Sequence, residues 1–179
     1  MDLRSVALGS LSIVFVRQLW VAGSTFKIIR SEGRRLEHLA IPASIMMVAW
    51  LSGSISPGVW TVAAGCGVAA CSLVLLEWSR MSIRGQFFSY LFSHDVPGFL
   101  WTAGPYAYVR NPFYASYLLA YASAVIMVRS LAMILLFGGM FVFYSAAALK
   151  EERKFARSPL AAEYEAYKQR TGRFIPKLG

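Results

Sequence analysis

Long apolar stretches separated by short polar segments give the chain its pattern. Most are close to the roughly 20 residues that an α-helix needs to cross the hydrocarbon core of a bilayer. The five stretches are residues 6–29, 39–52, 59–78, 112–128 and 131–149. The second is shorter than the others and contains Pro42, a residue that helix interiors tolerate poorly. The pattern predicts an all-α, polytopic membrane protein with about five transmembrane helices.

Two tight turns connect neighbouring predicted helices. The Gly- and Pro-containing segment 53–58 joins the second helix to the third, and residues 128–130 join the fourth to the fifth. The last two predicted helices therefore form an antiparallel hairpin, about 26–28 Å long at the helical rise. The two open ends of this hairpin must meet at the same membrane face.

The chain becomes polar after the fifth predicted helix. Residues 151–170 are expected to form a helix that lies at the membrane interface. Its aromatic side carries Phe155, Tyr164 and Tyr167. Ser158 and Pro159 suit a fresh helix start inside this segment, with Ser158 as the N-cap. Residues 173–176 are expected to form an extended strap across other elements.

Composition and charge narrow the possible partners. The chain is 57% hydrophobic, whereas soluble domains are usually about 45–50% apolar. The formal net charge is +9, and nucleic acid is the first partner that a basic chain suggests. The basic residues lie beside apolar stretches, however, so anionic lipid headgroups explain them better. Membrane lipids are therefore the expected partners, and neither nucleic acid nor a protein partner is predicted.

The basic residues also predict an orientation. Of the 18 Lys and Arg residues, four lie in the last turn of the first predicted helix or after it, three lie between the third and fourth, and eight follow the fifth. In a five-helix topology all of these lie on one face, and cytoplasmic loops carry the excess of Lys and Arg. The protein is therefore predicted to be integral to a bacterial inner membrane. Its N-terminus is expected outside, and its C-terminus in the cytoplasm.

Candidate chemistry gathers at the open end of the predicted hairpin. Residues 104–114 lead into the fourth helix, and Glu151 and Glu152 follow the fifth, so the hairpin brings both motifs to one face. The combined site would hold a cation, an amide, aromatic rings and two carboxylates. This set suits a ligand with charges of both signs and an aromatic base, such as S-adenosylmethionine. The candidate cofactor-binding residues are Gly104, Pro105, Tyr106, Tyr108, Val109, Arg110, Asn111, Pro112, Tyr114, Glu151 and Glu152.

The same residues resemble a known family. Residues 104–114 are similar to the Gly-Pro-Tyr…Arg-(His/Asn)-Pro-x-Tyr motif of the isoprenylcysteine carboxyl methyltransferases. That family belongs to a wider group of integral-membrane methyltransferases that includes the phospholipid N-methyltransferases. Later motif residues agree in order and approximate spacing: Glu151-Glu152, Phe155, Tyr164, Tyr167 and Ile175-Pro176. The resemblance implies a single domain over residues 1–179, with the cofactor-binding half at 80–179. It also implies a cytoplasm-facing S-adenosylmethionine site, closed by the tail, and a tunnel to the bilayer.

Two positions depart from the pattern of the prenylcysteine enzymes. Asn111 replaces the commoner His, and bacterial relatives often show the same change. The Asn amide does not titrate, so a proton-transfer role at this position is excluded. Ala147 stands where those enzymes look to carry an Arg that would hold the carboxylate of the acceptor. This change argues against a prenylcysteine carboxylate as the acceptor.

The function implied by the resemblance is S-adenosylmethionine-dependent transfer of a methyl group to a lipophilic acceptor, a small molecule or a lipid, by in-line displacement. The candidate catalytic residues are Glu151, Arg110 and His94. An amine or alcohol acceptor would require a base, and Glu151 and His94 are the residues that could supply one.

Other interpretations stay open at this point. A membrane reductase of the sterol-reductase type would hold a nicotinamide cofactor in a similar hairpin and tail. A non-enzymatic membrane protein, such as a transporter subunit, should instead gather its polar residues near the middle of the membrane. Arg17, inside the first apolar stretch, would either pair with Glu77 or contribute to an acceptor site. Two separated His and two Cys inside one apolar stretch predict no metal site.

Overall fold

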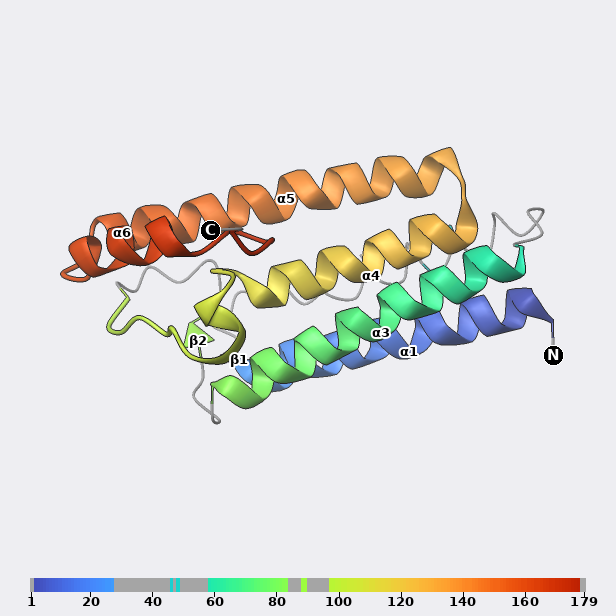
Figure 1. The fold of residues 1–179 in the computed structure, drawn as a ribbon, viewed down its shortest axis with the longest axis horizontal. Helices are drawn as coiled ribbons and strands as arrows, with labels where there is room; N and C mark the ends of the chain where they lie inside the picture. Colours follow the sequence, from blue (N-terminus) through green and yellow to red (C-terminus); the bar gives the residue numbers. More distant parts are fainter. Residues whose placement is uncertain are drawn as a thin grey trace.

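The structure is a bundle of long α-helices with short helices at one end (Figure 1). It is a computed structural model that describes residues 2–27, 46, 48, 58–83, 88–89 and 97–177. Its helices are α1 (Leu3–Thr25), α3 (Val59–Ser82), the 3₁₀ helix η1 (Gly104–Ala107), α4 (Pro112–Val128), α5 (Leu131–Ala156) and α6 (Ala161–Arg170). The two-residue strands β1 (Phe26–Lys27) and β2 (Phe88–Ser89) pair in parallel.

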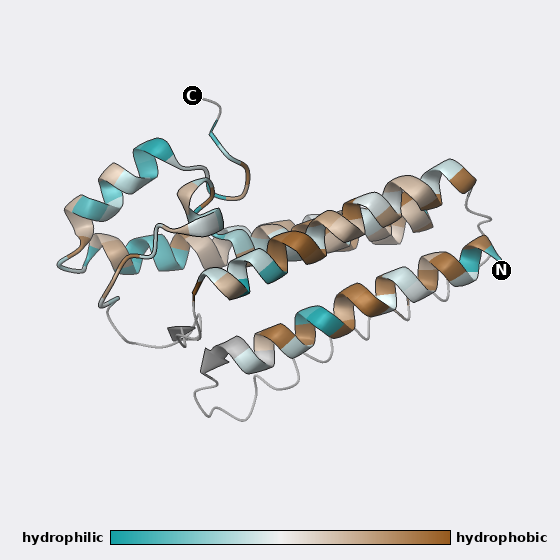
Figure 2. Ribbon diagram, turned by 60° about the horizontal axis from the view of Figure 1, so that its bottom comes forward, coloured by the Kyte–Doolittle hydropathy of each residue, from teal (hydrophilic) through white to brown (hydrophobic). Residues whose placement is uncertain are grey.

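The long helices confirm the all-α, polytopic membrane class. Leu3–Ala22, Val59–Ser82 and Leu131–Ala156 are long and apolar enough to cross a bilayer. α4 is apolar as well, but it has 17 residues. Figure 2 shows that hydrophobic residues run along the long helices, whereas hydrophilic residues gather in α6 and the adjoining end of α5. The predicted helix over residues 39–52 lies outside the described residues, apart from Met46 and Val48.

The predicted hairpin is confirmed. α4 has the predicted bounds, and the turn after it places Arg129 in the left-handed region at φ 52°. Ser130 then caps α5, because its side chain accepts a hydrogen bond from the Met133 backbone N–H. α4 packs against both α3 and α5, so the hairpin joins the rest of the bundle through α4.

The predicted break between the fifth helix and the polar segment is wrong. α5 continues without interruption through Glu151 and Glu152 to Ala156. Residues 150–156 are mostly Lys, Glu, Arg and Ala, which are strong helix formers, so the helix persists after the apolar stretch ends. The apolar pattern therefore marked the membrane-spanning part and not the end of the helix.

The start of α6 also differs from the prediction. Leu160, and not Ser158, occupies the N-cap position. The Ser158 hydroxyl donates to Phe155 O at 2.7 Å and accepts from Leu160 N at 3.1 Å. These local bonds compete with a capping role, so Ser158 stabilises the turn between α5 and α6.

Small residues allow the central helices to approach closely. Ala120 and Ala124 of α4 are fully buried, and a Cβ added at Gly65 of α3 would overlap the Met127 side chain. Close approach of backbones at small residues is the usual basis of helix association inside membranes. α3 therefore packs between α1 and α4 and places its C-terminal end beside η1.

Candidate active site

The motif before α4 begins with a sharply bent backbone at Gly104. Its φ of 63° lies in the left-handed region that favours glycine. An added Cβ would also overlap the Ser82 side chain at the end of α3. Gly104 therefore sets η1 directly against α3, and Pro105 behind it is buried. The next residues lead to Asn111, which occupies the N-cap position of α4.

The C-terminal tail pairs with this motif through Gly172 and Arg173, so it crosses other elements as predicted, but residues 173–175 form bends and are not extended. Gly172 O accepts from Arg110 N at 2.8 Å, and Gly172 N donates to Tyr108 O at 3.1 Å. Asn111 N donates to Arg173 O at 3.2 Å. Val109 and Gly172 form the corresponding parallel bridge. The strap therefore lies along residues 108–111, although more than 60 residues separate the two segments.

The buried Tyr167 side chain fixes α6 to the motif, and the Thr171 side chain bonds back to the end of α6. The Tyr167 hydroxyl donates to Tyr106 O at 2.6 Å, and Thr171, fully buried, donates to Tyr167 O at 2.7 Å. Burial raises the pKa of Tyr167 to about 12, so its hydroxyl keeps its proton at neutral pH. Burial, followed by the charge of Glu151, raises the pKa of Tyr106 as well. Both phenols are therefore neutral hydrogen-bonding groups.

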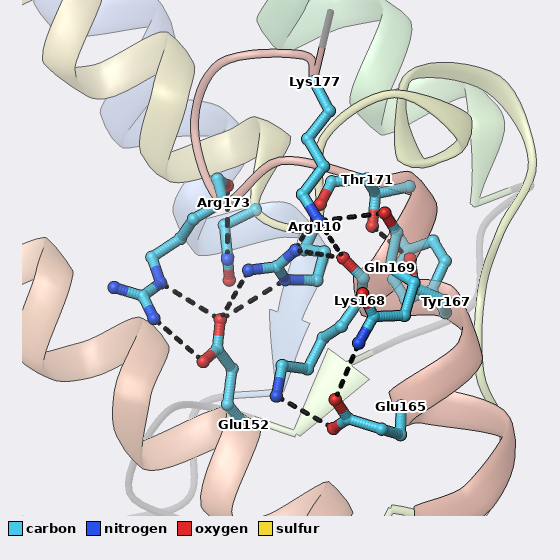
Figure 3. Close-up of polar contacts among 10 residues, drawn as sticks. Arg110, Glu152, Glu165, Tyr167, Lys168, Gln169, Thr171, Arg173 and Lys177 are labelled. Atoms are coloured by element: carbon cyan, nitrogen blue, oxygen red, sulfur yellow. Dashed lines mark hydrogen bonds and ion pairs between the residues drawn. The ribbon is translucent and has the colours of Figure 1, made fainter. Parts of the chain in front are cut away.

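Arg110 and Arg173 share the carboxylate of Glu152 (Figure 3). Arg110 Nη2 lies 3.2 Å from Glu152 Oε1, and Arg173 Nη2 lies 3.0 Å from Glu152 Oε2. Arg110 also donates to Thr171 O and, at 3.4 Å, to Lys168 O. The hydrogen bond to Glu152 is the largest cause of a raised pKa of Arg173. These contacts tie the start of α4, the end of α5 and the strap together.

The three charged side chains differ in exposure. Arg110 and Glu152 are 9% and 11% exposed, whereas Arg173 is 35% exposed. Arg110 is thus largely committed to protein acceptors. The more open Arg173, which the sequence analysis placed only in the strap, is the arginine of this group that a ligand can reach.

Glu151 has a different environment from its neighbour Glu152. The Tyr114 hydroxyl donates to Glu151 Oε1 at 2.7 Å. The Tyr114 ring stacks on Tyr144 with centroids 5.2 Å apart, and Tyr117 lies 5.6 Å from Tyr144. The carboxylate therefore lies at the edge of a group of tyrosine rings from α4 and α5. This group, Tyr114, Tyr117 and Tyr144, is called the tyrosine group below.

The structure brings together most of the predicted site. Tyr106, Arg110, Asn111, Tyr114, Glu151 and Glu152 take part in the contacts described above. Tyr108 differs, because its exposed ring lies 6.2 Å from Trp78 of α3. His94 lies outside the described residues, and Ala147 is buried in α5. No cluster of metal-ligating side chains occurs in the part of the chain that the structure describes.

Tyr144 and Arg173 were missed as site residues. Tyr144 precedes Glu151 by seven residues, two helical turns, and therefore lies on the same face of α5. That spacing could have identified it if α5 had been recognised as continuous. No local signal identifies Arg173, because its contact with Glu152 depends on the path of the strap.

The fold and the site define a polytopic helical membrane protein whose charged and aromatic site lies at the open end of a hairpin. The model of the phospholipid methyltransferase family matches residues 60–161, which is more than half of the chain. The protein belongs to the phospholipid methyltransferase family and is a membrane methyltransferase. No curated protein and no solved structure matched the chain.

Proposed function

We propose that the protein transfers a methyl group from S-adenosylmethionine to a lipophilic acceptor, at a site formed by the open end of the α4–α5 hairpin and the strap. The observation that carries this proposal is the pairing of Tyr114 with Glu151 beside the Arg110–Glu152–Arg173 contacts. Side chains of both charges and several aromatic rings thus share one site. When bound, S-adenosylmethionine supplies an electrophilic methyl group on a sulfonium, open to in-line attack.

The residues present fit this cofactor by charge and shape. The Glu151 carboxylate and the tyrosine rings favour a cationic group near them. The half-exposed Arg173 is suited to a carboxylate, because a guanidinium offers several donors in one plane. Glu152 binds both Arg110 and Arg173, and these contacts hold the strap, and with it Arg173, against the start of α4.

The acceptor is proposed to be a lipid or lipophilic molecule that carries an amine. Glu151 is the carboxylate next to the tyrosine group, and it accepts the proton that an ammonium must lose before its nitrogen can attack. Ala147 lies one turn before Glu151 on the same face of α5 and is buried. A methyl side chain there gives an acceptor carboxylate no partner, and an unpaired buried carboxylate is costly. The site is proposed to face the cytoplasm.

Calorimetry on the purified protein tests the cofactor. S-adenosylmethionine and S-adenosylhomocysteine should bind, and Arg173→Gln should weaken both by about tenfold, the loss of one charged hydrogen bond. Arg129→Gln, at the opposite end of the hairpin, is the matched control and should bind as the unchanged protein does. Binding of NADPH with no binding of either methyl-donor ligand would refute the proposal.

A lipid-extract assay with a radiolabelled methyl donor tests the acceptor. Label should enter an amine-bearing lipid, and Glu151→Gln should reduce this transfer far more than it reduces cofactor binding. A farnesylcysteine analogue is the comparison substrate. Rapid carboxyl methylation of that analogue would contradict the acceptor class while leaving the methyltransferase assignment intact.

A further inference from the structure

A second charged group lies away from the candidate active site, between α1 and α3. Arg17 Nε lies 2.5 Å from Glu77 Oε1, and Arg80 Nε lies 2.8 Å from Glu77 Oε2. The Cζ atoms of Arg17 and Arg80 lie 4.3 and 6.0 Å from the centroid of the Trp20 ring. Arg17, Trp20, Glu77 and Arg80 are called the Arg17 cluster below. It confirms the pairing of Arg17 with Glu77.

The Arg17 cluster carries more positive charge than its own carboxylate balances. Two guanidinium groups share the single carboxylate of Glu77, which leaves a formal charge of one positive unit. Each guanidinium has five N–H donors, and each arginine gives its Nε–H to Glu77. No hydrogen bond among the described residues uses the terminal nitrogens of Arg17 or Arg80. An unsatisfied donor is costly at the edge of a bilayer, where water is scarce, so these nitrogens favour an anionic partner rich in oxygen.

The cluster lies at the surface of the helices that the structure describes. The side chains of Arg17 and Arg80 are 37% and 36% exposed, and Trp20 is 54% exposed. A ligand that approaches from the bilayer can therefore reach all three.

The depth of the cluster matches a lipid headgroup region. Arg80 lies two residues before the end of α3, and Arg17 lies about 12 Å before the end of α1 at the helical rise. Both helices end at the same end of the bundle as η1 and α6 (Figure 1). Long basic side chains reach from such positions toward the headgroups, and tryptophan is enriched at that level.

We propose that the Arg17 cluster binds the phosphate group of an anionic phospholipid, in the leaflet on the active-site side. The terminal N–H groups of Arg17 and Arg80 donate to the phosphate oxygens, and the Trp20 ring packs beside the upper part of the lipid. The excess positive charge matches the single negative charge of such a lipid and gives no comparable preference for a zwitterionic one. The candidate active site is built by other elements, η1, α4, α5 and the strap, so this lipid is not the methyl acceptor.

Lipid titrations of the purified protein test this site. Phosphatidylglycerol and phosphatidylcholine with identical acyl chains are titrated into protein in a neutral detergent, and affinity is measured by native mass spectrometry. The unchanged protein should prefer phosphatidylglycerol. Arg80→Gln lowers the charge of the cluster from one positive unit to zero and should weaken phosphatidylglycerol binding about fivefold.

Glu77→Gln provides a test in the opposite direction. It raises the charge of the cluster to two positive units while keeping an amide oxygen as acceptor, so phosphatidylglycerol should bind about fivefold more tightly. A purely structural ion pair would instead lose stability in Glu77→Gln with no change in lipid preference. Arg129→Gln, an exposed arginine at the other end of the bundle, is the control and should keep the preference of the unchanged protein.

Three outcomes would overturn the proposal. The first is equal binding of the two lipids by the unchanged protein. The second is a phosphatidylglycerol preference that neither Arg80→Gln nor Glu77→Gln alters. The third is displacement of phosphatidylglycerol by inorganic phosphate at equal concentration, which would show a site for a free anion and not for a lipid. None of these outcomes depends on methyl transfer, so the proposed function is tested separately.

Discussion

At the scale of single residues, adjacent glutamates at the end of α5 have separate roles. Glu152 is held by two arginines, one of them in the strap, whereas Glu151 meets the Tyr114 hydroxyl. Successive residues on a helix point about 100° apart, so the pair faces two different neighbours. One carboxylate thereby holds the tail, and the other lies beside the tyrosine group.

Tyr114 and Tyr117 allow a matched test of the hydroxyl on Glu151. Tyr114→Phe removes a hydrogen bond to a carboxylate, and we expect a loss of about 1–2 kcal/mol in the free energy of unfolding, with reduced methyl transfer. Tyr117→Phe removes a buried hydroxyl that has no hydrogen-bond partner among the described residues, and it should leave stability unchanged or slightly raised. Thermal unfolding in detergent measures both. Equal losses in the free energy of unfolding would show that the Tyr114–Glu151 hydrogen bond contributes no stability of its own.

At the scale of elements, the strap lies against the segment that leads into α4. It contributes backbone partners to residues 108–111 and the Arg173 side chain to Glu152. Phe174 of the strap also contacts Phe141 of α5, with ring centroids 6.1 Å apart. The strap is therefore held at both helices of the hairpin.

Gly172 is the position at which the strap is most sensitive to substitution. An added Cβ would overlap the backbone oxygen of Ile175, so Gly172→Ala should displace the strap and weaken the Arg173–Glu152 contact. We expect a lower melting temperature and at least tenfold weaker binding of S-adenosylhomocysteine. Gly138→Ala in α5 is the control, because open space surrounds that position and Ala favours a helix. Calorimetry measures the affinity for S-adenosylhomocysteine in both variants. An unchanged affinity in Gly172→Ala would show that the strap does not contribute to ligand binding.

At the scale of the whole molecule, the described helices place the two ends of the chain at different ends of the bundle. The N-terminus lies far from α6, and the strap returns along α5 from the α6 end (Figure 1). α1 and α3 both end at the end of the bundle where α4 starts. This arrangement is the one that a five-helix topology requires.

Reporter fusions test the orientation. A reporter after Gly179 should be cytoplasmic, and a reporter before Met1 should be external. In that orientation 15 of the 18 Lys and Arg residues lie on the cytoplasmic face, as the positive-inside rule requires. Phosphatase and fluorescent-protein fusions report the two locations. Both termini on one side of the membrane would eliminate the five-helix topology.

The sequence alone determined the α4–α5 hairpin and the meeting of Arg110 with Glu152 at its open end. The bounds of α4 and the turn to α5 followed from the length of the apolar stretches and from residues 128–130. A short turn makes the two helices run antiparallel, and Arg110 and Glu152 lie at similar separations from that turn along the chain, so they come close. These features depend on local sequence and on the thickness of the bilayer, which act without long-range contacts.

Only the tertiary structure decided which polar groups pair with one another. The sequence offered several cations near Glu152 and several tyrosines near Glu151, and these are chemically equivalent until the strap and α6 are placed. The choice of Arg110, Arg173 and Tyr114 depends on contacts between segments separated by up to 61 residues along the chain. Such contacts are selected by the packing of the whole chain, because only in the assembled bundle do burial and geometry distinguish one side chain of a type from another.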